Sequence, residues 1–243
     1  MPRSSRLNDL AARHGDNPRR GRRGEALAPP VVAVVIAAAL YALLPESLLL
    51  GPRLVVPAIE IALLVALVVT NPRRLTRQTR ISRMASLTLA GVVVVTNLVA
   101  LGILVAKVSS AQAGQPGPLL FAALQVWATN VIGFALIYWE LDRDDPVSRA
   151  RRARPDLPHA DWRFSQDEND DAVVEVSAGS SARAGWIPQF VDYLYLSVTN
   201  SSAFSPTDTM PLTTRAKALM AVQATAALLT SLLIIARAVG SIQ

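Results

Sequence analysis

The sequence predicts an all-α fold, a polytopic membrane bundle of about six transmembrane helices. Hydrophobic residues make up 51% of the 243 positions, and they are gathered in long runs rather than spread with the period of an amphipathic helix. Several of these runs are long enough to cross a bilayer, which takes about 20 apolar residues. The connections between them are rich in arginine, as is typical of loops that face the cytoplasm. We therefore expect an integral membrane protein rather than a soluble domain.

Four apolar runs form a first transmembrane region, 27–140, which follows an arginine-rich tail, 1–26. The residue before a proline rarely adopts helical backbone angles, so Asn71-Pro72 is expected to end the second run. We expect the four helices to span about 27–44, 54–70, 84–106 and 118–139.

The orientation follows from the distribution of arginine. The loop 71–83 holds five arginines and no acidic residue, which places it in the cytoplasm. The tail 1–26 is polar and leads into further membrane segments, so we expect an uncleaved cytoplasmic N-terminus. Four spans return the chain to the cytoplasm, where 141–185 forms a polar, partly disordered loop. Because basic charge is almost all arginine, as in GC-rich bacterial genomes, we expect a multi-pass protein of a bacterial plasma membrane.

The last part of the chain, 186–243, consists of an amphipathic segment, a polar elbow and an apolar helix from about 212 to 240. The amphipathic segment, 186–204, is barely long enough to cross a membrane at about 1.5 Å per residue. If it crosses, the protein has six spans with both termini in the cytoplasm, and the topology favours this arrangement. The alternative is five spans plus a re-entrant, pore-type helix.

This helix-elbow-helix arrangement resembles the pore module of two-helix potassium channels. Tyr195, Ser197, Val198 and Asp208 match the pore signature Y-F-S-V-V-T-L-T-T-V-G-Y-G-D when the two are aligned without gaps. The T-V-G-Y-G filter, whose carbonyl geometry needs glycine, is replaced by the run 203–207, which has no glycine and contains a proline. The resemblance implies a pore-like module without a potassium filter.

A second resemblance covers more of the C-terminal pattern. The sequence Phe204-Ser-Pro-Thr-Asp-Thr, followed by Arg215-Ala-Lys-Ala-Leu and a final apolar helix, is similar to that of an uncharacterised family of small bacterial integral membrane proteins. Membership of that family implies no activity.

Polar residues in apolar surroundings are the candidate functional residues. A carboxylate in a membrane helix is costly and is usually partnered, so Glu60 is either a proton or cation site or a hydrogen-bonded strut. Asn97, Gln125 and Asn130 are expected to be hydrogen-bonding links between helices more than pathway residues. The remaining candidates lie in the C-terminal module: for a pathway Asp192, Thr199, Asn200, Ser201 and Ser202, and for the elbow Ser205, Pro206, Thr207 and Asp208.

Two functions fit these patterns. The first is a channel-like pathway for a monovalent cation, formed by a homo-oligomer (a tetramer, if it is a pore) through the C-terminal module, with Asp208 at its mouth. The alternative is a non-enzymatic membrane scaffold or partner-binding subunit that acts through 1–26 and 141–185. A weaker third hypothesis is a small transporter that uses Glu60.

Other functions are disfavoured by composition. The chain has no cysteine and its only histidines are His14 and His159, which argues against disulfides, metal sites and a histidine-based catalytic cluster. No G-x-S-x-G motif occurs, so we expect neither an enzyme nor a cofactor. The net charge of +6 is explained by cytoplasmic loops that face anionic lipid, so the expected partner is the bilayer and not nucleic acid.

Overall fold

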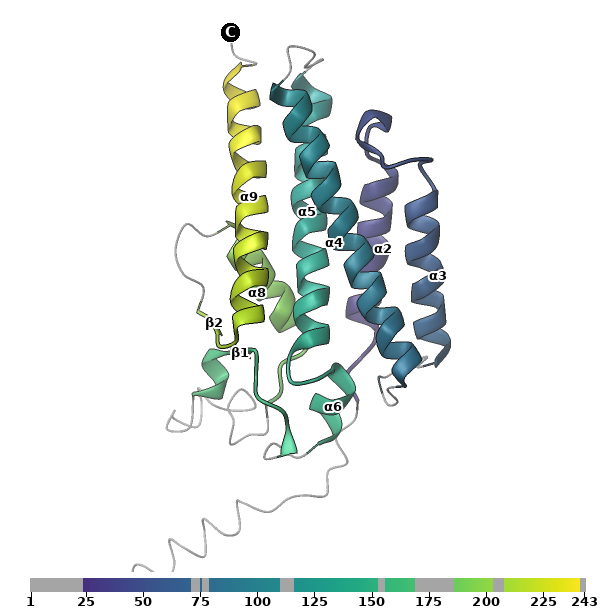
Figure 1. The fold of residues 1–243 in the computed structure, drawn as a ribbon, viewed down its shortest axis with the longest axis vertical. Coiled ribbons are helices and arrows are strands. Elements are labelled where there is room, and N and C mark those ends of the chain that lie inside the picture. The colour runs from purple at the N-terminus through teal and green to yellow at the C-terminus, as the bar shows by residue number, and fades with distance from the viewer. Residues whose placement is uncertain are drawn as a thin grey trace, which may run out of the picture.

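The computed structural model describes residues 24–70, 75, 79–109, 116–152, 156–168, 186–202 and 208–240. Five long helices run side by side, and a polar cap of short elements closes one end of the bundle (Figure 1). The long helices are α2 (Ala28–Ala42), α3 (Val55–Thr70), α4 (Arg80–Ser109), α5 (Pro116–Leu141) and α9 (Thr214–Gly240). The shorter elements are η1 (Glu46–Leu48), α6 (Pro146–Arg151), β1 (Trp162–Arg163), η3 (Ser165–Asp167), α8 (Phe190–Ser202) and β2 (Met210–Pro211).

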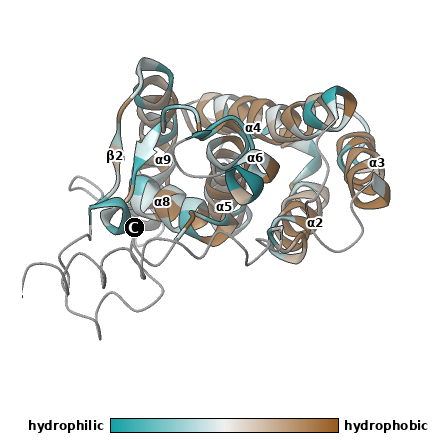
Figure 2. Ribbon diagram, turned by 90° about the horizontal axis from the view of Figure 1, so that it is seen from below, coloured by the Kyte–Doolittle hydropathy of each residue, from teal (hydrophilic) through white to brown (hydrophobic). Residues whose placement is uncertain are grey.

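Apolar helices make the described part of the chain suited to a membrane, as the sequence predicts. Three of its helical stretches, in α4, α5 and α9, are long and apolar enough to cross a bilayer, and α2 and α3 are apolar but shorter. Large hydrophobic side chains also face outward, among them Val69 at 74% exposure and Ile81 at 81%. Figure 2 shows the hydrophobic character of α2 to α5 and the hydrophilic character of α6 at the cap.

Helix α5 lies at the centre of the bundle, against α2, α4, α8 and α9. Gly133 is required where α5 meets α4, because a Cβ at this position would lie 2.8 Å from Cγ2 of Val94. Buried apolar side chains form one cluster toward the cap, around Phe134 and Tyr138, and another toward the opposite end, around Leu48 and Leu104.

Helix α8 differs from the sequence prediction. The segment 186–204 was expected to cross the membrane, but its helix has only 13 residues, which rise roughly 20 Å. The chain from Trp186 to Gln189 is not helical. Helix α8 begins at the polar cap and ends part-way along the bundle, and β2 and the start of α9 lie at the cap again (Figure 1).

Helices α8 and α9 therefore start at the same end of the bundle. Six full-length helices are not found among the described residues, where the short α8 accompanies five longer helices. Asp208 lies at the cap end, since its carbonyl accepts the Ser165 hydroxyl, and not at the opposite end, where a crossing segment would have placed it.

The loop 141–185 is partly ordered. We call its described parts, 141–152 and 156–168, the polar cap; they contain α6, β1 and η3. A two-residue antiparallel pairing joins β1 to β2, with Trp162 opposite Pro211. The tail up to residue 23 and residues 153–155 and 169–185 of the loop lie outside the described residues.

Candidate functional site

Buried charged side chains gather where α5, α6, β1, α8 and α9 meet at the polar cap. Asp142 and Asp161 are completely buried, and Arg149 is 1% exposed. Buried charges persist only when hydrogen bonds and opposite charges replace water. Each of these buried charged side chains therefore needs hydrogen-bond or ion-pair partners within the protein.

Asp142 links three separate parts of the chain. One carboxylate oxygen accepts hydrogen bonds from the backbone N–H of Asp161 at 2.8 Å and of Trp162 at 3.4 Å. The other accepts the hydroxyl of Tyr193 in α8 at 2.6 Å. Two consecutive non-glycine residues with positive φ follow, Arg143 at 50° and Asp144 at 81°. This left-handed turn, which is uncommon for L-residues, leads the chain from α5 into α6.

Asp161 fixes the beginning of α9. Its carboxylate accepts the Thr213 hydroxyl at 2.5 Å and Nε of Arg215 at 2.7 Å, and its carbonyl accepts the N–H of Leu212 at 2.8 Å. Thr213 in turn caps the helix, since its hydroxyl oxygen accepts the N–H of Ala216 at 3.2 Å. The cap thus determines where the last helix starts.

Aromatic rings surround the charged groups. Trp162 is completely buried, with its ring centroid 4.8 Å from that of Tyr138 in α5 and 6.5 Å from that of Tyr193. Its indole N–H donates to the sulfur of Met220 in α9 at 3.3 Å. The guanidinium of Arg149 lies 5.0 Å from the centroid of the Tyr193 ring, a cation–π contact, and donates to the carbonyl of Asp142 at 2.5 Å.

Glu25, just before α2, binds groups at the same end of the bundle. Glu25 accepts the N–H of Phe190, the first residue of α8, at 2.5 Å and the indole N–H of Trp139 at 3.0 Å. Burial raises the pKa of Glu25 above the ordinary value of a glutamate, although the Phe190 N–H opposes this shift. Nearby, the hydrogen bond from Arg83 of α4 lowers the pKa of Asp144.

A second polar network lies deeper in the bundle, around Gln223 of α9. Its side-chain nitrogen donates to the hydroxyl oxygens of Ser197 at 2.5 Å and Ser201 at 2.8 Å. Its side-chain oxygen accepts the Tyr138 hydroxyl at 2.6 Å and the Asn200 amide at 2.8 Å. This single glutamine joins α5, α8 and α9.

The structure places the pathway candidates of α8 in different roles. Asn200 and Ser201 belong to the Gln223 network. Thr199 and Ser202 donate to carbonyls of their own helix, to Tyr195 at 3.0 Å and Val198 at 2.6 Å respectively. Asp192 accepts the N–H of Gln189 at 2.7 Å and so caps the first turn.

One face of α8 is exposed. Val191, Tyr195, Val198 and Ser202 form this face, and Tyr195 is 57% exposed. The opposite face, with Tyr193 and its neighbours, packs on α5 and α9.

The structure does not bring Glu60 to the elbow. Glu60 is 2% exposed and lies on α3, which is on the other side of the bundle from α8 and α9 (Figure 1). Its Oε2 atom has no hydrogen-bond partner among the described residues. Asn97 and Gln125 link helices as expected, since Asn97 donates to the Val126 carbonyl at 2.7 Å and Gln125 to the Leu40 carbonyl at 3.3 Å. The side chain of Asn130 is buried with no partner in the described part of the chain.

Of the elbow candidates, the structure describes only Asp208. It is exposed at the polar cap, and its carbonyl accepts the Ser165 hydroxyl at 3.5 Å. Ser205, Pro206 and Thr207 lie outside the described residues.

Sequence reasoning missed Asp142, Asp161 and Tyr193, which connect the cap to the helices, and Gln223 deeper in the bundle. Residues 161–164 dock on helices of their own chain, through Trp162 to Tyr138, Tyr193 and Met220. Gln223 could have been identified as a lone amide in an apolar helix, but nothing in the sequence indicated its partners.

Comparisons with protein-family models, curated proteins and solved structures found no match to this chain.

Replacing Gln223 by leucine is expected to lower the free energy of unfolding by about 1–2 kcal/mol, because the change leaves several buried hydroxyl and amide groups unpaired. Thr225→Val is the matched control, since Thr225 lies on the exposed face of the same helix. Chemical denaturation of the purified protein in detergent measures both values. Equal effects of the two substitutions would contradict the role assigned to Gln223.

Proposed function

We propose that this protein is a bacterial plasma-membrane protein in which α2, α3, α4, α5 and α9 cross the bilayer and α8 re-enters it from the cytoplasmic side. Arg80 and Arg83 of α4 and Arg149 and Arg151 of α6 lie toward the cap end, which supports a cytoplasmic location for that end. The N-terminus is then cytoplasmic, and an odd number of crossings leaves the C-terminus on the opposite side.

We further propose that α8, the elbow and α9 line a cation pathway. The observation that carries this proposal is that α8 ends part-way along the bundle (Figure 1). The last carbonyls of a helix lack intrahelical partners and carry the negative end of its dipole. Broken or half-length helices use such ends to coordinate cations within membranes. The C-terminal end of α8, at Ser201 and Ser202, has this placement.

A homo-oligomer completes the pathway, because a single half-helix cannot enclose one. The exposed face of α8, with Val191, Tyr195, Val198 and Ser202, is continuous in sequence with the elbow. Helix α9 also has an exposed side, which includes Val222 and Leu229. A tetramer that brings these faces together would resemble the subunit arrangement of the channels to which the C-terminal sequence is similar.

The test is cation flux through purified protein in liposomes. Asp208→Asn is expected to reduce flux by about tenfold at low ionic strength and by less at high salt, because an exposed carboxylate concentrates cations at the entrance. Asp156→Asn is the matched control: Asp156 is an exposed acid of the same cap outside the helix-elbow-helix module. Its flux is expected to equal that of the unsubstituted protein.

Two results would overturn the pathway. One is the absence of flux from folded, reconstituted protein, and the other is a strictly monomeric state in the membrane. Under the scaffold alternative, Asp208→Asn has no effect and removal of 1–23 and 169–185 abolishes activity. No contact among the described residues favours that alternative, since 161–164 is docked on its own chain.

A further inference from the structure

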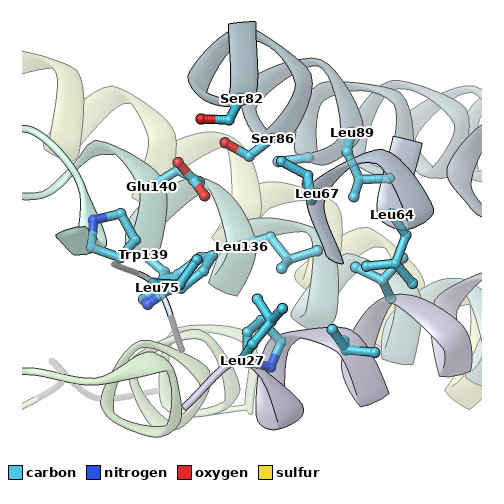
Figure 3. A pocket seen from close by; sticks show the side chains of 15 residues that line it. Leu27, Leu64, Leu67, Leu75, Ser82, Ser86, Leu89, Leu136, Trp139 and Glu140 are labelled. Atoms are coloured by element: carbon cyan, nitrogen blue, oxygen red, sulfur yellow. The ribbon is translucent and has the colours of Figure 1, made fainter. Parts of the chain in front are cut away.

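A pocket opens between α2, α3, α4 and α5 at their cap ends (Figure 3). It encloses about 590 Å³, part of it open to the surroundings. Its walls are apolar for most of their length and come from several helices; they include Leu27, Val31, Val34, Leu64, Leu67 and Leu89. The pocket lies away from α8 and α9 and so does not belong to the proposed cation pathway.

One end of the pocket is polar. Glu140 of α5 and the hydroxyls of Ser82 and Ser86 of α4 lie there, facing one another (Figure 3). Glu140 is 4% exposed, and its Oε2 atom has no hydrogen-bond partner among the described residues. Among the residues that line the pocket, Glu140 alone is ionisable.

The polar end holds one unpaired acceptor. The Ser82 oxygen accepts the N–H of Thr79 at 2.9 Å and its hydroxyl at 3.3 Å, so its acceptor positions are taken. Ser86 hydrogen-bonds to Glu140, and Arg149 and Arg83 add attraction from a distance, but Oε2 of Glu140 still has no hydrogen-bond partner among the described residues. A buried carboxylate oxygen without a donor is costly. A ligand that brings an N–H donor and a positive charge to Oε2 would remove this cost.

We propose that this pocket binds the primary ammonium group of an amphiphile, with the apolar chain of that amphiphile lying along the leucine-lined wall. An ammonium carries three N–H donors and one positive charge, so it can donate to the unpaired Oε2 of Glu140 and is attracted to the carboxylate as a whole. A fatty acid would place a second carboxylate beside Glu140. A quaternary ammonium carries the charge but has no N–H to donate.

Two sources supply this chemistry, the headgroup of an aminophospholipid and a free long-chain amine. The pocket lies at the cap end of the bundle, which we assign to the membrane surface, so either can reach it. The shared recognition element is the ammonium on an apolar chain.

The experiment is a titration of the purified full-length chain in neutral detergent with dodecylamine, with the thermal unfolding midpoint as the readout, because a ligand that binds the folded state raises this midpoint. Dodecylamine is expected to raise it, whereas dodecyltrimethylammonium and dodecanoate have smaller effects. Glu140→Gln is expected to weaken dodecylamine binding by about tenfold or more. Glu60→Gln, the same change at another buried acid that does not line the pocket, is the control and leaves binding unchanged.

A second variant keeps the test decisive if Glu140→Gln does not fold. Leu67→Trp fills the chain-binding part of the pocket without touching Glu140, and it is expected to abolish the response to dodecylamine. The two sources are distinguished by repeating the titration in bilayers that contain phosphatidylethanolamine and in bilayers of phosphatidylcholine alone. If phosphatidylethanolamine occupies the pocket, the response to dodecylamine is lost in the first bilayers, which assigns a lipid headgroup. An unchanged response assigns a free amine. The proposal is overturned if dodecanoate or dodecyltrimethylammonium binds as well as dodecylamine, or if both pocket variants respond like the unsubstituted protein.

Discussion

Replacing Asp142 by alanine is expected to lower the free energy of unfolding by about 3–5 kcal/mol, because removing one partner of a buried charged network leaves the others without compensation. The substitution takes the acceptor from the Tyr193 hydroxyl and from the N–H groups of Asp161 and Trp162. It also removes the carboxylate that lies 3.7 Å from Nε of the buried Arg143. These groups have no route to water in the folded protein, so each carries its own desolvation cost.

Chemical denaturation of the purified protein in detergent measures this loss. Asp142→Asn keeps the shape of the side chain and an oxygen that can accept the N–H groups of Asp161 and Trp162. It is expected to cost less than the alanine substitution. Asp156→Ala, at an exposed acid of the same cap, is expected to change the free energy of unfolding by no more than about 0.5 kcal/mol. If Asp142→Ala and Asp156→Ala prove equally mild, the cap is not held by Asp142.

Replacing Trp162 by alanine is expected to cost about 3–5 kcal/mol of unfolding free energy, the range typical of a deleted buried aromatic side chain. The indole is completely buried and contacts α5 through Tyr138, α8 through Tyr193 and α9 through Met220. Its removal therefore leaves a cavity where three helices converge. Few other single side chains in the described part of the chain join so many elements.

Trp162→Phe is the informative comparison, because it keeps most of the ring volume and loses the indole N–H. It is expected to cost clearly less than alanine. Since Tyr193 contacts both side chains, with its ring on the Trp162 indole and its hydroxyl on the Asp142 carboxylate, the two alanine substitutions are expected to be non-additive by about 0.5–3 kcal/mol in a double-mutant cycle. Full additivity, or a Trp162→Ala protein as stable as the phenylalanine variant, would contradict the central packing role of the indole.

The apolar helices could be predicted closely from the sequence. The run expected at 27–44 is α2 at Ala28–Ala42, and the run expected at 118–139 is α5 at Pro116–Leu141. Such runs are local signals, because bilayer thickness sets their length and charged or proline-containing segments set their ends. The start of α9 was also close, since its Thr213 cap is a local feature.

The short course of α8 could not be predicted in this way. A length of 19 residues is compatible with both crossing and re-entering, and the arginine rule constrains only the flanking loops. What decides the path is that the chain is held at the cap end of the bundle both before α8 and before α9, by Phe190 donating to Glu25 and Leu212 donating to Asp161. These contacts join residues far apart in the sequence, and no local pattern encodes such pairs.

Among the candidate residues, too, local patterns could be predicted from the sequence and contacts between distant segments could not. Helical periodicity alone puts residues 195, 198 and 202 on one face of α8, and the structure shows that this face is exposed. The Gln223 network and the Asp142 cluster were not predicted, because polar residues on four different segments give no periodic signal. Glu60 was identified as a buried acid in an apolar helix, and the structure separates it from the module with which it had been grouped.

The parallel start of α8 and α9 has a consequence for biosynthesis. When α8 leaves the ribosome it is a short segment with serine and asparagine side chains, too polar and too brief to partition into lipid unaided. The group that satisfies Asn200 lies 23 residues later in the chain, on α9. In the topology proposed above, α8 therefore has to wait on the cytoplasmic face until α9 has entered the bilayer. A ribosome stalled before Gln223 would then leave the module outside the membrane, open to chaperones and proteases.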